Sequence, residues 1–246
     1  PDGTSRIAIL WDQTIPGNPP IGYALGSVYT RQQINEALAS STPEERFALV
    51  PSRDVTGHGT AVLGIAAGNG RSSADAAMRG VAPEATLVVV KLGNPDPADL
   101  PRTSQLLQAV DFCVRYALLV ERPLVINLSF GNNYGSHSGD SLLETYLNAV
   151  SNLGQNVICI GAGNEGDTGR HYTGNLKSDR KSSGQTQTVR PTSDPAATSA
   201  VSATADRAVS VEFQVGAYES SFSLQIWKVY GDEISIELIS RGGIRS

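Results

Sequence analysis

The sequence comprises 246 residues, of which 40% are hydrophobic and 17% charged, which excludes a disordered or charge-rich arm. Its 24 acidic and 19 basic residues give a net charge of -5, so nucleic acid is not expected as the main partner. The sequence lacks a run of about 20 apolar residues, so no membrane-spanning segment is expected. The only cysteines, Cys113 and Cys159, lie in apolar segments and are expected to be buried free thiols rather than a disulfide framework.

Short apolar runs and helix-like patterns alternate through residues 1–166. Four runs rich in Val, Ile and Leu, without polar alternation, predict strands covered on both faces at 6–11, 86–92, 124–128 and 156–160. A capping box of Thr30 and Gln33 opens a predicted helix. Helical spacing predicts two more helices, at 106–117 and 142–150. This order predicts an α/β fold in which a parallel sheet lies between two layers of helices, with its chemistry at the carboxyl ends of the strands.

The pattern changes after residue 166. Residues 167–204 are rich in Ser, Thr, Gly, Asp and Pro, which is typical of a loop or linker. Hydrophobic and polar residues then alternate in the runs 209–215, 222–226 and 234–238, which predicts an antiparallel β unit with one solvated face. The chain opens at Pro1 without a methionine, and three strands are few for a free-standing sandwich. We therefore expect an excerpt of a longer protein, with one domain over 1–166 and a linker with a partial β unit over 167–246.

The most informative motif for function lies at residues 54–68, which read DVTGHGTAVLGIAAG. His58 is flanked by glycines, which allow other backbone or a substrate to approach the imidazole closely. It opens a predicted helix of small apolar residues, which would let the helix pack closely on the sheet. The positive end of the helix disfavours the imidazolium and helps keep His58 able to accept a proton. A capping histidine without a catalytic role is the alternative for this motif taken alone.

Two other expected strands lead into segments suited to peptide chemistry. Asn164 follows the fourth strand and stands among glycines, where its amide could donate a hydrogen bond to a carbonyl oxygen that becomes an oxyanion. An ordinary Asn-Gly-type turn is the alternative there. The segment 129–131 follows the third strand, and its backbone could pair with an extended peptide. A plain exit from strand to loop is the alternative in that case.

Taken in order, these motifs resemble the subtilisin-like serine protease family (peptidase S8). Residues 58–60 resemble the family's His-Gly-Thr box, and residues 80–83 resemble its Gly-Val-Ala-Pro turn. Residues 129–131 resemble the Ser-Leu-Gly segment of the substrate cleft, with Phe130 in place of the usual leucine. Residues 162–166 are similar to the family's oxyanion loop.

This resemblance implies a subtilisin-like fold and the hydrolysis of peptide bonds through an acyl-enzyme. It implies that His58 is the general base and that Asn164 is the oxyanion donor. Ser129, Phe130 and Gly131 would bind the substrate residue that precedes the cut.

The resemblance is closer to one branch of the family, the bacterial germination proteases of the Csp type. Residues 2–15 resemble a segment that this branch carries between its catalytic aspartate and histidine. The alternating runs around Phe213, 224–228 and 236–240 resemble its inserted jelly-roll domain, which sits between the oxyanion asparagine and the nucleophile. The resemblance therefore implies a partial jelly-roll-like insertion at the C-terminal end of this chain.

Two members of the catalytic triad have no convincing counterpart in the sequence. A peptidase of this family needs an aspartate that orients the histidine and a serine that acts as nucleophile. Asp12 follows a strand but is succeeded by Gln-Thr rather than Thr-Gly or Ser-Gly, so we interpret it as structural. The only Gly-Thr-Ser sequence ends at Ser5, ahead of His58, whereas the family order is Asp, His, Ser. We expect both groups to lie outside the chain, which by itself would then not cleave peptides.

The leading hypothesis is a fragment of a serine endopeptidase that acts on a peptide or protein substrate, with its own prodomain as a further candidate partner. The alternative is a pseudoprotease or peptide-binding scaffold without catalysis. A third hypothesis is that residues 209–240 form a carbohydrate- or protein-binding module. His137 and His171 lie in polar loops where we expect them to be solvated, and no ligand spacing supports a metal site. No cofactor is expected. The free thiols and the bacterial branch favour a cytoplasmic or spore-associated protein over a secreted one.

Overall fold

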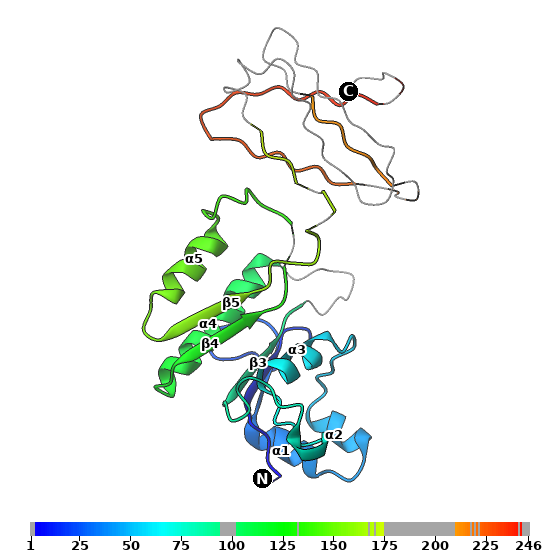
Figure 1. Cartoon of the computed structure of the whole chain (residues 1–246). Coiled ribbons are helices and arrows are strands. Elements are labelled where there is room, and N and C mark those ends of the chain that lie inside the picture. The colour runs from blue at the N-terminus through cyan, green and yellow to red at the C-terminus, as the bar shows by residue number, and fades with distance from the viewer. Residues whose placement is uncertain are drawn as a thin grey trace. The chain divides into compact units, whose positions relative to one another are not determined.

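The computed structural model describes residues 3–93, 102–131, 133–166, 168–169, 171–174, 210–216, 218, 220, 222–240 and 242. Its elements are β1 (Ile7–Asp12), β2 (Ser27–Thr30), α1 (Arg31–Ala39), α2 (Pro43–Leu49), α3 (His58–Ala67), a 3₁₀ turn (Ala74–Ala76), β3 (Leu87–Lys91), α4 (Thr103–Leu119), β4 (Leu124–Leu128), α5 (Leu142–Ser151) and β5 (Asn156–Ile160) (Figure 1). No helix in the described part of the chain combines the length and apolar character needed to cross a membrane.

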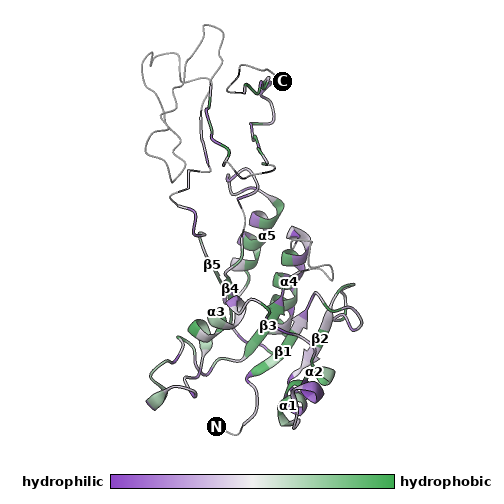
Figure 2. Cartoon of the chain, turned by 90° about the vertical axis from the view of Figure 1, so that its right-hand side faces the viewer, coloured by the Kyte–Doolittle hydropathy of each residue, from purple (hydrophilic) through white to green (hydrophobic). Residues whose placement is uncertain are grey.

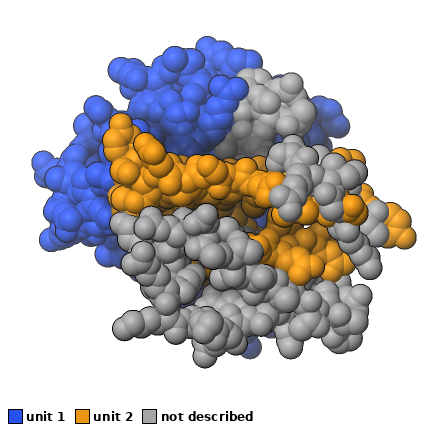
Figure 3. Space-filling model, turned by 90° about the horizontal axis from the view of Figure 1, so that it is seen from above, with its two compact units in different colours: residues 1–129, 141–160 blue, residues 130–140, 161–246 orange. Residues whose placement is uncertain are grey.

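The chain divides into two compact units, coloured separately in Figure 3. The first unit comprises residues 1–129 and 141–160, and the second comprises residues 130–140 and 161–246. Every helix and strand named above lies in the first unit.

The strands of the first unit form two sheets rather than the single parallel sheet that the sequence predicted. β1 lies between β2 and β3, antiparallel to β2 and parallel to β3. β4 and β5 form a separate parallel pair in which Leu124 lies opposite Asn156. The four predicted strands are confirmed. The expectation of one wholly parallel sheet was wrong, because β2 adds an antiparallel edge and β3 does not pair with β4 among the described residues.

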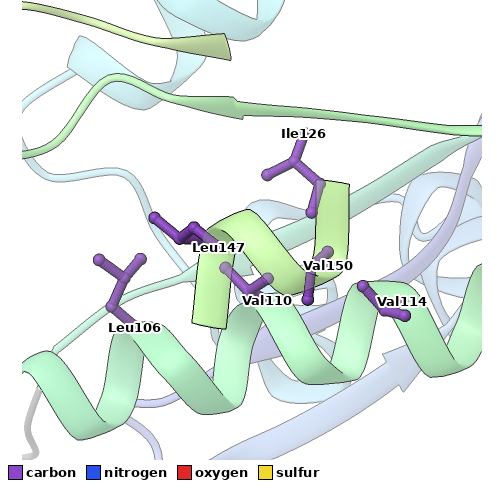
Figure 4. Close-up of a cluster of buried hydrophobic side chains, with 6 residues drawn as sticks. All are labelled: Leu106, Val110, Val114, Ile126, Leu147 and Val150. Carbon is purple, nitrogen blue, oxygen red and sulfur yellow. The ribbon is translucent and has the colours of Figure 1, made fainter. Parts of the chain in front are cut away.

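α4 and α5 pack together against one face of the β4–β5 pair. Leu106, Val110 and Val114 recur every fourth residue along α4, so their side chains share one face of the helix. Figure 4 shows this face meeting side chains from α5 and from β4. The buried cluster consists of Leu106, Val110, Val114, Ile126, Leu147 and Val150.

This cluster predicts a large difference between two leucines of the same helix. Leu106 is 7% exposed and Leu118 is 70% exposed. We expect Leu106→Ala to lower the free energy of unfolding by about 2–3 kcal/mol, because it removes buried methyl groups and leaves a cavity. The matched control, Leu118→Ala, should change it by less than about 0.5 kcal/mol. Urea unfolding of both variants checks this, and equal losses would contradict the described packing.

The other face of the β4–β5 pair is exposed. Val125 and Val157 are 69% and 53% exposed and alternate with residues that face the helices. The expectation of strands covered on both faces is therefore wrong for this pair within the described residues. Cys159 on the same face is exposed, whereas Cys113 packs against the buried cluster, and both are free. Burial raises the pKa of the Cys113 thiol to about 12, so only one of the two predicted buried thiols is sheltered.

Trp11 connects the β1 sheet to α4. Its side chain is fully buried, and its ring centroid lies 4.9 Å from that of Tyr23 and 5.1 Å from that of Phe112 on α4. The indole N–H donates to the carbonyl oxygen of Leu25 at 3.1 Å. A Cβ at Gly26 would lie 2.4 Å from the indole nitrogen, so only glycine lets this loop close over the ring. Figure 2 shows that β1 and β3 are mostly hydrophobic.

The second unit contains no assigned strand among its described residues. Large hydrophobic residues of the three runs whose alternation predicted a buried β face are between 39% and 57% exposed: Val211, Phe213, Val215, Phe222, Leu224, Ile226, Ile236 and Leu238. The predicted antiparallel β unit is therefore not confirmed, because these side chains are not buried and the described residues of this unit include no strand that covers them. Residues 175–209, which include most of the predicted linker, lie outside the described residues.

Candidate active site

His58 is the first residue of α3 and is exposed. The preceding residue, Gly57, has a φ of +78°, in the left-handed region that favours glycine. Gly57 has no side chain to cap the helix, and the carboxylate of Asp54 takes that role. Its Oδ1 accepts the N–H of Gly57 at 2.9 Å, and its Oδ2 accepts the N–H of Thr60 at 2.8 Å. The first turn of the helix that carries His58 is thereby fixed.

Asp54 is held in its ionised form by the same contacts. The hydroxyl of Thr60 donates to Oδ2 at 2.7 Å and contributes most to the shift that lowers the pKa of Asp54 to about 2. Backbone N–H groups of the helix start add to this effect. A carboxylate at this position also interacts favourably with the positive end of the helix.

We expect the carboxyl group of Asp54 to titrate near pH 2. Because this folded-state pKa lies below that of an unfolded aspartate, about 3.9, the cap contributes stability that is fully present above about pH 4. That contribution is lost as the pH falls toward 2. Carbon-13 NMR of the side-chain carboxyl measures the midpoint directly. Asp54→Asn should flatten the dependence of unfolding free energy on pH within this window. A midpoint near 4 in the native protein would contradict the capping geometry.

The far end of α3 is closed by the Gly-Val-Ala-Pro turn. The N–H groups of Gly80, Val81 and Ala82 donate to the carbonyl oxygens of Gly68, Ile65 and Ala66 at 2.8, 3.2 and 2.9 Å. A Cβ at Gly80 would lie 2.5 Å from the nitrogen of Gly68, so the turn can approach the helix only with glycine there. α3 buries only Ala67, so backbone hydrogen bonds hold it in place. The expectation that its small residues pack closely on the sheet is wrong in the described structure.

Asn164 lies in the loop that follows β5 and belongs to the second unit. It is exposed, and within the described residues no hydrogen bond involves its side-chain amide. Gly163 before it has a φ of +86°, which glycine adopts without strain. Glu165 is the next residue, and its backbone oxygen accepts two hydrogen bonds from Thr168. The backbone N–H of Thr168 donates at 3.1 Å and its side-chain hydroxyl at 2.8 Å. The loop therefore presents the Asn164 amide to solvent from a turn that has internal hydrogen bonds.

The segment Ser129 to Gly131 follows β4, and its three residues are exposed. The hydroxyl of Ser129 accepts a hydrogen bond from the amide of Asn127 at 3.0 Å. Ser129 belongs to the first unit together with His58, whereas Phe130 and Gly131 belong to the second unit together with Asn164. A shared cleft for these residues remains a prediction.

Comparison with known proteins identifies the family. Residues 27–242 match the model of the subtilase family, Peptidase S8. The chain belongs to the subtilase family. It is also similar to the solved structure of the CspB protease of Clostridium perfringens, with 34% sequence identity and a TM-score of 0.58. This similarity covers 68% of the chain and 32% of the CspB protease, so the chain spans about a third of that protein's length.

These comparisons confirm the predicted subtilisin-like α/β fold and the likeness to the Csp branch of the subtilases. The range 27–242 matched by the family model includes His58, Ser129, Phe130, Gly131 and Asn164.

The side chains of Asp12 and Ser5 are engaged in contacts that do not include His58. Asp12 is fully buried, and its Oδ1 accepts the N–H of Thr14 at 2.8 Å and its hydroxyl at 2.5 Å. Its Oδ2 accepts the hydroxyl of Ser52 at 2.6 Å and pairs with Lys91 at 3.3 Å. The hydroxyl of Ser5 accepts the N–H of Ile7 at 3.1 Å. These contacts support a structural role for both residues.

His137 and His171 are exposed, as the sequence predicted, but they are also in contact with each other. Their rings stack on each other in the second unit with centroids 4.9 Å apart and an interplanar angle of 8°. Among the described residues, no group of three or more His, Cys, Asp or Glu side chains is placed to hold a metal ion. The stack joins two loops, a contact that the polar sequence around each histidine did not indicate.

Proposed function

We propose that this chain supplies the general base and the oxyanion donor of a serine endopeptidase that hydrolyses peptide bonds through an acyl-enzyme. The observation that carries the proposal is the placement of His58. Its side chain is exposed at the start of a helix whose two ends are both held by hydrogen bonds. At the first end the Asp54 carboxylate accepts a helix N–H, and at the other end the N–H groups of residues 80–82 donate to helix carbonyl oxygens. Membership of the subtilase family gives such a histidine its chemical context.

In this proposal His58 takes the proton from a serine hydroxyl as that oxygen attacks the scissile carbonyl, and later returns it to the leaving amine. A general base works only when it keeps a fixed position, because the proton passes over a hydrogen-bond distance. The capped turn at Asp54 meets this need through the backbone of His58 and leaves the imidazole exposed to a substrate.

Asn164 would stabilise the negative charge that develops on the carbonyl oxygen. Its amide is exposed and makes no hydrogen bond with the described residues, so it is available as a donor. The segment 129–131 would bind the peptide in extended form and line the site for the residue before the cut. A peptide or protein is accordingly the substrate class, and a prodomain of the same protein is a candidate to bind the same segment.

The chain by itself is proposed to be inactive. The triad also needs an orienting aspartate and a nucleophilic serine, and the contacts of Asp12 and Ser5 suit neither role. Residues 1–166 would form part of the catalytic domain, and residues 167–246 a linker and part of a jelly-roll-like insertion. The bond from the N–H of Gly135 to the Gln225 Oε1, at 3.2 Å, supports an insertion that packs on the loop after the cleft segment.

A fluorophosphonate probe, which reacts with activated serines, tests this proposal. We expect about one equivalent of label on the full-length gene product and none on the 246-residue chain. Stoichiometric labelling of the 246-residue chain would show that it contains its own nucleophile and would overturn its proposed inactivity. If the full-length product is also unlabelled and cleaves no peptide, the peptidase proposal fails and a pseudoprotease that binds peptides is favoured.

A further inference from the structure

Two loops of the second unit are held together by direct side-chain contacts. One loop, residues 133–140, follows the cleft segment 129–131, and the other, residues 161–174, carries Asn164. The rings of His137 and His171 stack across the two loops. The side-chain amide of Asn133 donates to Oε2 of Glu165, the residue that directly follows Asn164. We call these two contacts the loop clamp.

The histidine stack is a packing contact with a defined geometry. Its centroid distance of 4.9 Å and interplanar angle of 8° fall within the range of stacked aromatic pairs. Because the two ring planes are nearly parallel, the in-plane lone pairs of the nitrogens do not converge on one point. This distinguishes the pair from histidines that share a metal ion.

The backbone around His137 is built to hold its ring against His171. His137 has a φ of +55°, which is uncommon for a residue other than glycine and carries a conformational cost. Its Nε2 lies 3.1 Å from the carbonyl oxygen of Asn133, so the ring is tied to the start of its own loop. The hydroxyls of Ser136 and Ser138, on either side, both donate to the carboxylate of Asp140. These local bonds offset the cost of the left-handed conformation.

On the other loop, Glu165 is held through both its side chain and its backbone. Its carboxylate accepts from Asn133, and its carbonyl oxygen accepts from the backbone and hydroxyl of Thr168. Asn164 is therefore adjacent to a residue that is fixed from two sides. The loop otherwise contains glycines at 161, 163 and 166, which by themselves leave the backbone free to move.

We propose that the loop clamp positions Asn164 for the reaction, with Asn133, His137 and His171 acting as positioning residues. The inference rests on the proposed function, since it assigns the clamp to the oxyanion donor of that site. An oxyanion donor must lie about 2.7–3.1 Å from the charged oxygen, and a misplacement of about 1 Å can lower the rate about 100-fold. A glycine-rich loop can hold a donor at such a defined distance only when contacts from a neighbouring segment fix its backbone.

The test compares variants that remove a ring with variants that keep a flat ring in its place. Nitrogen-15 relaxation of the 246-residue chain measures the backbone order of residues 163–166 independently of catalysis. We expect order parameters near 0.85 in the wild type, and values below about 0.6 in His137→Ala and in His171→Ala. His137→Phe and His171→Phe, which keep the stack without the imidazole, should restore the wild-type values. The double alanine variant should show no further loss beyond either single variant, because both remove the same contact.

Catalysis by the full-length protein provides the second readout. The two alanine variants should lower kcat about 10-fold with little change in KM, and the phenylalanine variants should retain activity. Unchanged order parameters in the alanine variants, or an unchanged kcat despite a disordered loop, would overturn the proposal. If the wild-type protein has no peptidase activity but its order parameters respond as described, the proposed function fails while the clamp as a loop-ordering device stands.

Discussion

Replacing His58 by glutamine in the full-length protein is expected to lower kcat about 10⁶-fold. Glutamine cannot take the proton of the nucleophile, so the serine hydroxyl would have to attack without a base. The loss corresponds to about 8 kcal/mol of activation free energy. Steady-state cleavage of a chromogenic peptide by both proteins measures it, and KM should change little because the imidazole acts on the reacting atoms.

The fold of this variant should be intact, which separates the catalytic role from a structural one. His58 is exposed, and the first turn of α3 is capped through Asp54 and backbone N–H groups rather than through the imidazole. The midpoint of thermal unfolding should therefore match that of the wild type. A variant that keeps more than a few per cent of the activity would show that His58 is a capping residue without a role as base.

Asn164→Ala is expected to lower kcat of the same protein about 10²- to 10³-fold, or about 2.7–4 kcal/mol. The amide would stabilise a charge that exists only after the nucleophile attacks, so KM should stay close to its wild-type value. Asn148→Ala is the matched control, because Asn148 is an exposed asparagine on α5 and its replacement should leave kcat unchanged. A rise in KM with an unchanged kcat would instead assign Asn164 to ground-state binding of the peptide.

The sequence patterns predicted the longer elements with a clear apolar run or helical spacing and missed two short ones, α2 and β2. The runs at β4 and β5 and the spacing along α4 reflect a core that α4 and α5 build with these strands, and β1 contributes the buried Trp11 that packs on Phe112 of α4. α2 was missed although Thr42, Pro43 and Glu45 form a strong helix start, because none of its residues is buried and it has no apolar stripe. β2 was missed because its four residues take their conformation from pairing with β1. The division of the strands into two sheets could not be predicted either, because strand pairing joins residues that are far apart in the sequence.

The part of the candidate site that could be predicted from the sequence consists of polar residues with glycines beside them. His58 and Asn164 stand out because glycines beside a polar residue signal close approach, and resemblance to a family then supplied their roles. Asp54 was missed as a cap because Gly57, the residue at the usual capping position, has no side chain, and the carboxylate reaches the helix from three residues earlier. The stack of His137 on His171 joins separate loops, so no local pattern indicates it.

The central claim is that the His58 imidazole and the Asn164 amide act on the same carbonyl group. A crystal structure of the full-length protein after reaction with a peptidyl phosphonate tests it most directly. We expect the phosphonyl oxygen to accept a hydrogen bond from the Asn164 amide at about 2.7–3.1 Å, with a His58 ring nitrogen within about 3.2 Å of the modified serine oxygen. An adduct formed with either side chain far from the phosphorus centre would contradict the assignment of both residues.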